Sequence, residues 1–146
     1  MSRFDDFMPF IIKWEAVRDK QGRIIVENDP ADPGGATYMG IDQASHPHIN
    51  VRTLDTETAT AIYKQEWDSA AIESKPFKLG EVYFNACVNC GVGRANKLIR
   101  SSKDASGFID NQETFYRSLA SARPPLAKFL KGWLNRTSDL RNFLHI

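Results

Sequence analysis

The sequence has few of the residues that build metal sites or disulfide frameworks: its 146 residues include only two cysteines and three histidines. Cys87 and Cys90 stand in a C-x-x-C spacing, which would suit a redox pair or half of a zinc site. A zinc site needs two further ligands, and only the scattered His46, His48 and His145 could supply them. We therefore expect two small buried thiols and neither a metal nor an organic cofactor.

The sequence also lacks an excess of charge of one sign and a long hydrophobic run. A formal net charge of +1 does not provide the basic field of a nucleic-acid-binding protein, although it tolerates an anionic polymer. No apolar stretch is long enough to span a bilayer, so no membrane insertion is expected. The N-terminus does not resemble a signal peptide, because Asp5 and Asp6 interrupt it and Pro9 and Lys13 break its apolar stretch. We therefore expect synthesis in the cytoplasm.

The length and the hydrophobic pattern predict one compact, predominantly helical α+β domain. A short β-hairpin over 23–27 and a strand over 36–41 are expected to pack near the first helix. A polar linker is expected over 102–107. The predicted helices are Arg3–Glu15 with Ser2 as N-cap, then 55–72 with Asp55 as cap, 79–90, 94–101, 109–120, and a last helix after Pro125.

Glu15 ends an apolar helical stripe, which makes it the first candidate for chemistry. The stripe runs along one face of the first predicted helix through Phe4, Phe7, Met8, Ile11 and Ile12. A carboxylate on such a face has its charged form disfavoured, so its pKa should rise and the group can serve as a general acid. A glutamate that simply ends the helix in solvent is the alternative.

A turn rich in glycine, proline and aspartate follows the hairpin and offers a second carboxylate. Asp29 and Asp32 each precede a proline, and Thr37 has a hydroxyl group that could hold a water molecule beside an aspartate. Cleavage of a glycosidic bond usually takes two carboxyl groups, one to protonate the leaving oxygen and one to activate water or attack. Asp-Pro pairs are also common in plain turns, so the pattern alone leaves both interpretations open.

Aromatic and amide side chains supply candidates for substrate binding. Tyr38 adjoins the predicted site, Gln43 follows it, and Trp133 lies on the last predicted helix. Asn85 and Asn89 lie four residues apart on one face of the helix over 79–90, where amides could bind sugar hydroxyl or N-acetyl groups. Core packing for the aromatic rings and structural hydrogen bonds for the buried amides are the alternatives.

Taken together, these segments resemble glycoside hydrolase family 108, a family of lysozyme-like N-acetylmuramidases often found as phage endolysins. The resemblance covers nearly the whole chain. It rests on Glu15, on N-D-P-A-D-P-G-G-A-T-Y-M-G-I over 28–41, on F-N-A-C-V-N-C-G-V-G-R-A over 84–95, and on G-W-L-N-R over 132–136. Two departures stand out: Ala16-Val17-Arg18 replaces the usual glycines after the glutamate, and Asn85 stands where the family commonly has aspartate.

The resemblance implies a lysozyme-like fold, with a catalytic region over 1–101 and a C-terminal region over 102–146 similar to a peptidoglycan-binding segment, both packed into a single domain. It implies a monomeric muramidase whose partner is the peptidoglycan glycan strand and which acts in the periplasm or cell wall after release by a holin or a secretion system. Glu15 matches the catalytic acid. The order of residues also resembles phage lysozymes, in which Asp32 and Thr37 would position the attacking water. The alternatives are a chitinase-like or chitosanase-like glycosidase and a catalytically degenerate wall-binding module.

Overall fold

The computed structural model describes residues 2–28 and 35–146. Helix α1 spans Arg3–Glu15, as the sequence predicts, and begins with a capping box. The Ser2 side chain accepts a hydrogen bond from the Asp5 backbone N–H at 3.1 Å, and the Asp5 carboxylate accepts one from the Ser2 backbone N–H. Pro9 lies inside the helix without delaying its start. The predicted apolar stripe is confirmed, because Phe4, Phe7, Met8 and Ile11 are all buried.

Helix α2, Thr56–Ser69, packs its apolar face against α1. Asp55 caps it as predicted, since the Asp55 carboxylate accepts a hydrogen bond from the Thr58 N–H at 2.8 Å. Trp67 of α2 is fully buried, with the Phe4 ring edge-on at 5.5 Å and the Phe7 ring at 6.4 Å. Each large ring buried in this way contributes about 2–3 kcal/mol to stability. These aromatic contacts therefore fix α1 against α2.

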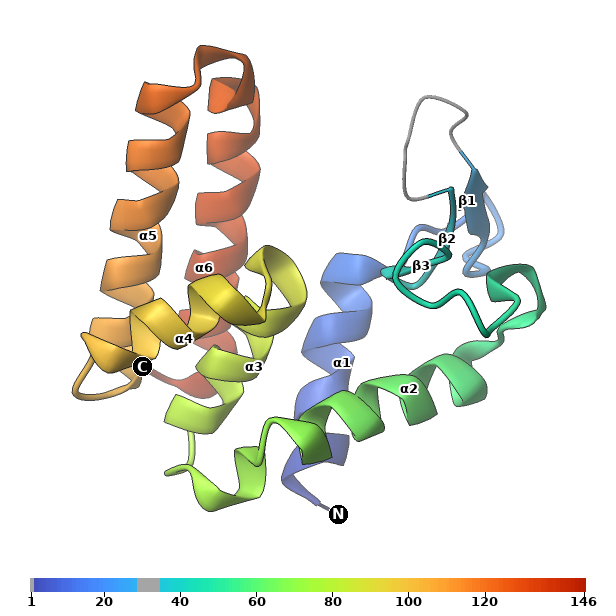
Figure 1. Cartoon of the computed structure of the whole chain (residues 1–146), viewed down its shortest axis with the longest axis horizontal. Coiled ribbons are helices and arrows are strands. Elements are labelled where there is room, and N and C mark those ends of the chain that lie inside the picture. Colours follow the sequence, from blue (N-terminus) through green and yellow to red (C-terminus); the bar gives the residue numbers. More distant parts are fainter. Residues whose placement is uncertain (1, 29–34) are drawn as a thin grey trace. The chain divides into compact units, whose positions relative to one another are not determined.

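A three-stranded antiparallel sheet in the order β1-β2-β3 is formed by Val26–Asn28, Ala36–Tyr38 and Ile41–Asp42. A continuous strand over 36–41 was the expectation, and it is wrong at two positions. Met39 and Gly40 adopt φ of 50° and 84°, the pattern of a two-residue type I′ hairpin turn. The turn reverses the chain and pairs Tyr38 with Ile41. Figure 1 shows the sheet beside the C-terminal end of α1.

The segment after α1 is ordered, although it departs from the family pattern. Arg18 and Ile24 form an isolated antiparallel bridge, and the Ile25 N–H donates to the Val17 carbonyl. The Asp19 carboxylate closes the turn by accepting hydrogen bonds from the backbone N–H groups of Gln21 and Arg23. These bonds hold the pKa of Asp19 below its ordinary value. The predicted hairpin therefore exists, but its pairing begins at Val17 instead of Arg23.

The second half of the chain is helical. Gly91, with φ of 90°, separates α3 from α4 as the sequence indicates. The expected polar linker over 102–107 is shorter, because Asp104 caps α5 by accepting from the Gly107 N–H at 2.8 Å. Pro124 and Pro125 open a 3₁₀ turn, so the last helix starts later than expected. The elements are α3 (Leu79–Cys90), α4 (Val92–Arg100), α5 (Ala105–Ala122), the 3₁₀ turn η3 (Pro124–Phe129) and α6 (Leu130–Leu144).

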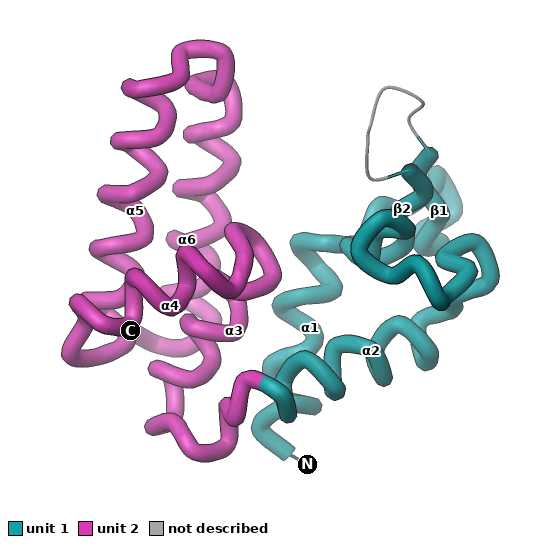
Figure 2. Tube along the Cα trace, viewed as in Figure 1, with its two compact units in different colours: residues 1–69 teal, residues 70–146 magenta. Residues whose placement is uncertain are grey.

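The chain forms two compact units, residues 1–69 and residues 70–146 (Figure 2). Unit 1 contains α1, α2 and the sheet, and unit 2 contains α3 to α6, with α5 and α6 side by side. The predicted catalytic region over 1–101 and the predicted peptidoglycan-binding region over 102–146 are defined by function, and this division stays a prediction. The fold is the expected predominantly helical, lysozyme-like α+β fold. Over the described residues, no helix is long and apolar enough to cross a membrane.

Candidate active site

Glu15 is the last residue of α1, and its half-buried side chain lies against the turn between β2 and β3. A Cβ built on Gly40 would come within 3.0 Å of the Glu15 Cβ and 3.2 Å of its carboxyl carbon. Glycine is the residue that adopts φ of 84° without strain and leaves this space to the glutamate. The Gly40 backbone therefore forms one wall of the surroundings of Glu15.

Tyr63 of α2 holds the same turn from a second side. Its buried hydroxyl group donates a hydrogen bond of 2.6 Å to the Met39 carbonyl. The oxygen also lies 2.5 Å from the point that a Gly40 Cβ would occupy. Glu15, Tyr63 and the Met39–Gly40 turn thus meet at one place in unit 1. The sequence alone does not connect the Tyr63 hydroxyl group with Glu15, because the two residues belong to different helices.

Thr37 occupies the centre of the sheet, in register with Glu27 of β1 and Asp42 of β3. Directly paired residues of neighbouring antiparallel strands project to the same face. Thr37 thus shares a face with two carboxylates, opposite the buried Ala36 and Tyr38. This row could not be predicted from the sequence, because strand register depends on the turn at Met39–Gly40.

The second predicted carboxylates, Asp29 and Asp32, lie outside the described residues, so their roles stay predictions. Of the two carboxylates that share a face with Thr37, Glu27 is exposed. The Asp42 carboxylate accepts hydrogen bonds from both the backbone N–H and the hydroxyl group of Ser45, at 3.1 and 3.0 Å. Asp42 therefore stabilises the turn that follows β3.

The two substrate-binding candidates next to the sheet have structural contacts. Tyr38 is buried, and its hydroxyl group lies 3.4 Å from the Thr56 Oγ1 at the start of α2. Gln43 organises the following loop: its Nε2 donates to the carbonyls of His46 and Ile49, and its Oε1 accepts from the Val51 N–H. These contacts favour packing and loop bracing over sugar binding for both side chains.

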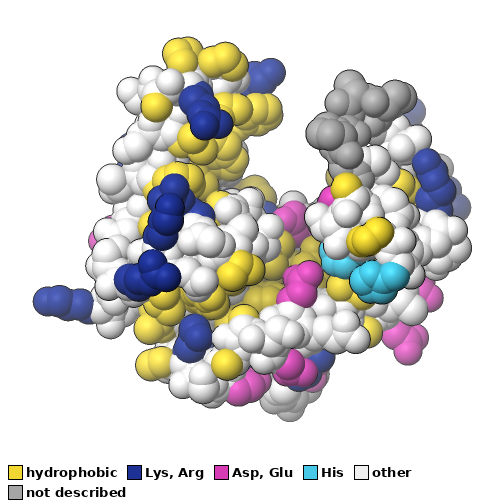
Figure 3. Space-filling view, viewed as in Figure 1, with side chains coloured by type: hydrophobic (Ala, Val, Ile, Leu, Met, Phe, Trp, Pro, Cys, Tyr) yellow, Lys and Arg dark blue, Asp and Glu magenta, His cyan; other side chains and the backbone are white. Residues whose placement is uncertain are grey.

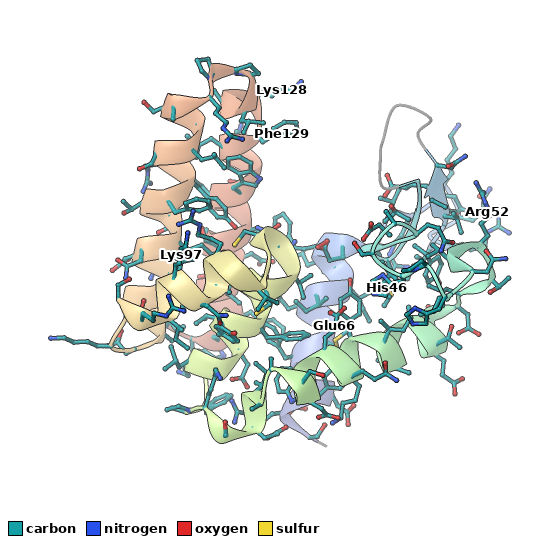
Figure 4. The ribbon with its side chains drawn as sticks, in the orientation of Figure 1. His46, Arg52, Glu66, Lys97, Lys128 and Phe129 are labelled. Atoms are coloured by element: carbon teal, nitrogen blue, oxygen red, sulfur yellow. The ribbon has the colours of Figure 1, made fainter. Side chains whose placement is uncertain are left out.

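Unit 1 also contains a histidine–glutamate pair that the sequence does not predict. His46 Nε2 lies 3.7 Å from the Glu66 carboxylate of α2, and Figure 4 shows the two side chains pointing toward one another. Desolvation raises the pKa of Glu66 above its ordinary value, while His46 acts in the opposite direction. The available signal was the position of Glu66 on the otherwise apolar face of α2.

The remaining candidates lie in unit 2. Asn85 is fully buried in α3, where its Oδ1 accepts hydrogen bonds from Arg136 Nε at 3.1 Å and Nη2 at 2.9 Å. Asn89 donates to the hydroxyl group of Tyr116. Burial raises the pKa of Tyr116 to about 12, so this hydroxyl group stays neutral. The two amides therefore join α3 to α6 and α5, which favours the structural interpretation.

Trp133, the last candidate, stacks on the Tyr116 ring at 5.1 Å and is half-buried. Phe129 of η3 lies 6.1 Å from Trp133 and is 47% exposed. Aromatic residues of α5, α6 and η3 thus form a row, and its exposed member is Phe129.

Cys87 and Cys90 are not joined in a disulfide, and both are half-buried, less buried than the sequence predicts. Burial raises the pKa of Cys90 to about 11, and its thiol donates to the Ala86 carbonyl. Within residues 2–28 and 35–146, no group of three or more His, Cys, Asp or Glu side chains could hold a metal ion.

Glu15 thus ends α1 against the turn of a small sheet, within a predominantly helical α+β fold. The sequence model of Glycosyl hydrolase 108 matches residues 8–91, which is more than half of the chain. The chain belongs to this family, and the matched segment includes Glu15, Thr37, Asn85 and Asn89.

The fold is also similar to that of a solved structure, "Structure of Brucella abortus SagA". The two chains share 22% sequence identity and superpose with a TM-score of 0.73. The similarity covers 95% of this chain and 91% of the Brucella abortus chain. No curated protein matches the sequence.

Proposed function

We propose that the protein is a muramidase, which hydrolyses the β-1,4 bond between N-acetylmuramic acid and N-acetylglucosamine in peptidoglycan. The observation that carries the proposal is the packing of Glu15 against Gly40, inside the segment matched by the family model. The contact fixes the direction of a carboxyl group at the junction of helix and sheet. Family membership makes the substrate a glycan, and lysozyme-like members of the family act on peptidoglycan.

In this proposal Glu15 donates its proton to the leaving glycosidic oxygen as the bond breaks. Thr37, with Asp32, orients the water molecule that attacks the anomeric carbon. The protein needs no metal or organic cofactor for these steps. If the two carboxyl groups stand about 6.5–9.5 Å apart, water fits between them and the product is inverted. A separation of about 5 Å instead predicts retention through a covalent intermediate.

The direct test is mass spectrometry of the fragments released from purified peptidoglycan. The wild-type protein should release muropeptides with N-acetylmuramic acid at the reducing end, and Glu15→Gln should lower the rate at least about 100-fold. Glu66→Gln is the matched control, because it changes another partly desolvated glutamate of unit 1 and should keep most of the activity. Equal rates for Glu15→Gln and the wild type would remove Glu15 from the mechanism.

The identity of the second carboxylate is tested with three amide variants. We expect Asp32→Asn to abolish activity. Glu27→Gln and Asp42→Asn should keep at least about a third of it, because these carboxylates take no part in proton transfer in this proposal. Greater loss with Glu27→Gln than with Asp32→Asn would transfer the role to the carboxylate that pairs with Thr37 in the sheet. Thr37→Val should lower the rate without unfolding the sheet, because valine has the same shape and a higher strand propensity.

The same assay separates the alternatives. Hydrolysis of chitin oligosaccharides in preference to peptidoglycan would identify a chitinase-like enzyme. Binding to peptidoglycan without release of fragments would identify a catalytically degenerate wall-binding module. Release from the cell by a holin or a secretion system belongs to the same proposal, and lysis by added protein only after permeabilisation of the outer membrane would support it.

A further inference from the structure

The two units have opposite charge, which the net value for the whole chain conceals. Residues 1–69 contain seven Lys and Arg against twelve Asp and Glu, a formal charge of −5. Residues 70–146 contain twelve Lys and Arg against six Asp and Glu, a formal charge of +6. Charge asymmetry between halves of a chain indicates interaction with a charged polymer or surface. Figure 3 shows Lys and Arg side chains over α4 and α5.

The basic charge is most concentrated on α4 and the residues that follow it. The segment 92–103 contains Arg94, Lys97, Arg100 and Lys103 and no acidic residue. At 100° per residue, Lys97 and Arg100 lie with Gly93 at the centre of the exposed face, opposite the buried Ala95 and Leu98. Figure 4 shows Lys97 projecting from α4.

Four of the six acidic residues of unit 2 have structural partners within the unit. Asp110 and Glu113 of α5 both accept hydrogen bonds from Arg141, at 2.6 and 3.1 Å. Glu81 is buried in the capping box of α3, and Asp104 caps α5. These four carboxylates are therefore engaged in contacts of their own, whereas Lys97, Arg100 and Lys103 are exposed to solvent.

We propose that the exposed face of α4, formed by Lys97 and Arg100 with Lys103 after the helix end, binds peptidoglycan by charge, separately from the bond-breaking site in unit 1. The inference rests on the proposed function, which makes peptidoglycan the substrate. Peptidoglycan carries the carboxylates of its stem peptides and is therefore the anionic partner that such a face complements. An acidic catalytic unit repels this polymer, and a basic unit on the same chain offsets the repulsion.

The attraction lies at the surface and is therefore sensitive to salt. The Debye length is about 10 Å at 0.1 M ionic strength and about 3 Å at 1 M, so exposed charges lose most of their attraction over this range. Lys97 and Arg100 also lie near the C-terminal end of α4, where positive charge stabilises the helix. A structural role of this kind does not make peptidoglycan binding sensitive to salt.

The test is sedimentation with purified peptidoglycan sacculi, with Glu15→Gln as the parent so that the polymer stays intact. The parent should bind at low ionic strength and dissociate at high ionic strength. K97E/R100E should bind about tenfold more weakly, because two exposed attractions are lost and each charge reversal also adds repulsion. K97R/R100K should bind like the parent, and circular dichroism should show the same helix content in every variant.

The matched control is K20E/R52E, which changes the net charge equally on exposed positions of unit 1 and should leave binding unchanged. Equal binding by K97E/R100E and the parent, or binding insensitive to salt, would overturn the inference. Preference for vesicles of phosphatidylglycerol over sacculi, or salt-sensitive self-association that K97E/R100E abolishes, would assign the face to a membrane or to a second copy instead.

Failure of the proposed function has a different signature. If the protein with native Glu15 releases no muropeptides but the salt-sensitive sedimentation depends on Lys97 and Arg100, the enzyme assignment fails and the binding face stands. If muropeptides are released and K97E/R100E binds sacculi like the parent, the binding face fails and the muramidase stands.

Discussion

Gly40 lies so close to Glu15 that a single added methyl group would touch the carboxyl carbon, at 3.2 Å. The same methyl group would stand 2.5 Å from the Tyr63 hydroxyl oxygen, a distance that real Cβ atoms do not adopt. Position 40 in the turn between β2 and β3 thus requires both a positive φ and the absence of a side chain. The absence of a side chain is what leaves room for the Glu15 carboxyl group.

Gly40→Ala should therefore destabilise the protein and displace Glu15. The positive φ costs about 1–2 kcal/mol for alanine, and the overlap with Tyr63 and Glu15 adds about 1–3 kcal/mol. Displacement of a catalytic group by about 1 Å can lower the rate about 100-fold. Urea unfolding gives the first quantity, and the release of muropeptides under conditions that keep the variant folded gives the second.

Gly22→Ala is the matched control, because Gly22 has nearly the same φ, 82°, but nothing within 4 Å of its added Cβ. It should show the cost of the backbone strain alone, about 1–2 kcal/mol, and full activity once folded. If the two variants lose equal stability and activity, the contact of Gly40 with Glu15 has no consequence and the strain explains the whole effect.

Tyr63→Phe should reveal how the hydroxyl group holds the turn. Its removal leaves the Met39 carbonyl without its 2.6 Å donor and should cost about 1–2 kcal/mol. It also removes the atom nearest to an added Gly40 Cβ. The double variant G40A/Y63F should therefore be about 1 kcal/mol more stable than the sum of the single changes predicts. Strict additivity in urea unfolding would mean that the two groups do not compete for the same space.

The sequence predicts much of this site, because the helix end and its apolar stripe are local patterns. Glu15 and its helix follow from the spacing of Phe4, Phe7 and Ile11. The row of Thr37 with Glu27 and Asp42 does not, since it depends on a turn at Met39–Gly40 that interrupts the expected strand. The structural use of Asn85 depends on Arg136, 51 residues away, and no local pattern reports a partner at that distance.

Asn85→Asp should stabilise the protein by about 1 kcal/mol near neutral pH. The Nδ2 of Asn85 is buried without a hydrogen-bond partner among the described residues, and aspartate removes this donor. The Arg136 guanidinium is already buried and donates to Oδ1 of Asn85, so the new carboxylate would face a cation. The guanidinium should hold the pKa of that carboxylate below its usual value. The gain should therefore be present above the usual carboxyl pKa and disappear as pH falls through the lowered value.

Thermal unfolding of the two proteins over a range of acidic pH checks this prediction. Asn85→Leu is the control, because it has a similar volume but removes the acceptor from Arg136, and it should cost about 3 kcal/mol. A loss of stability with aspartate at neutral pH would mean that desolvation of the carboxylate outweighs its pairing with Arg136.

The thiol of Cys90 should react slowly with alkylating reagents. Burial raises its pKa to about 11, so only about one thiol in a thousand is ionised at about pH 8. In a Cys87→Ser variant, where Cys90 is the single thiol, iodoacetamide should react about 100-fold more slowly than with a free cysteine. The rate should rise about tenfold per pH unit up to about pH 11 and should recover its ordinary value in denaturant.

The same shift makes the folded protein less stable at alkaline pH. Between the ordinary thiol pKa of 9.0 and the folded value of about 11, the unfolded chain releases the Cys90 proton while the folded protein keeps it. The free energy of unfolding should then fall by at most about 1.4 kcal/mol per pH unit from this group, and Cys90→Ala should remove that slope. A redox-active C-x-x-C pair would behave in the opposite way, because its reactive thiol has a lowered pKa and is alkylated rapidly near neutral pH. Rapid alkylation of the folded Cys87→Ser variant would therefore restore the redox interpretation that burial argues against.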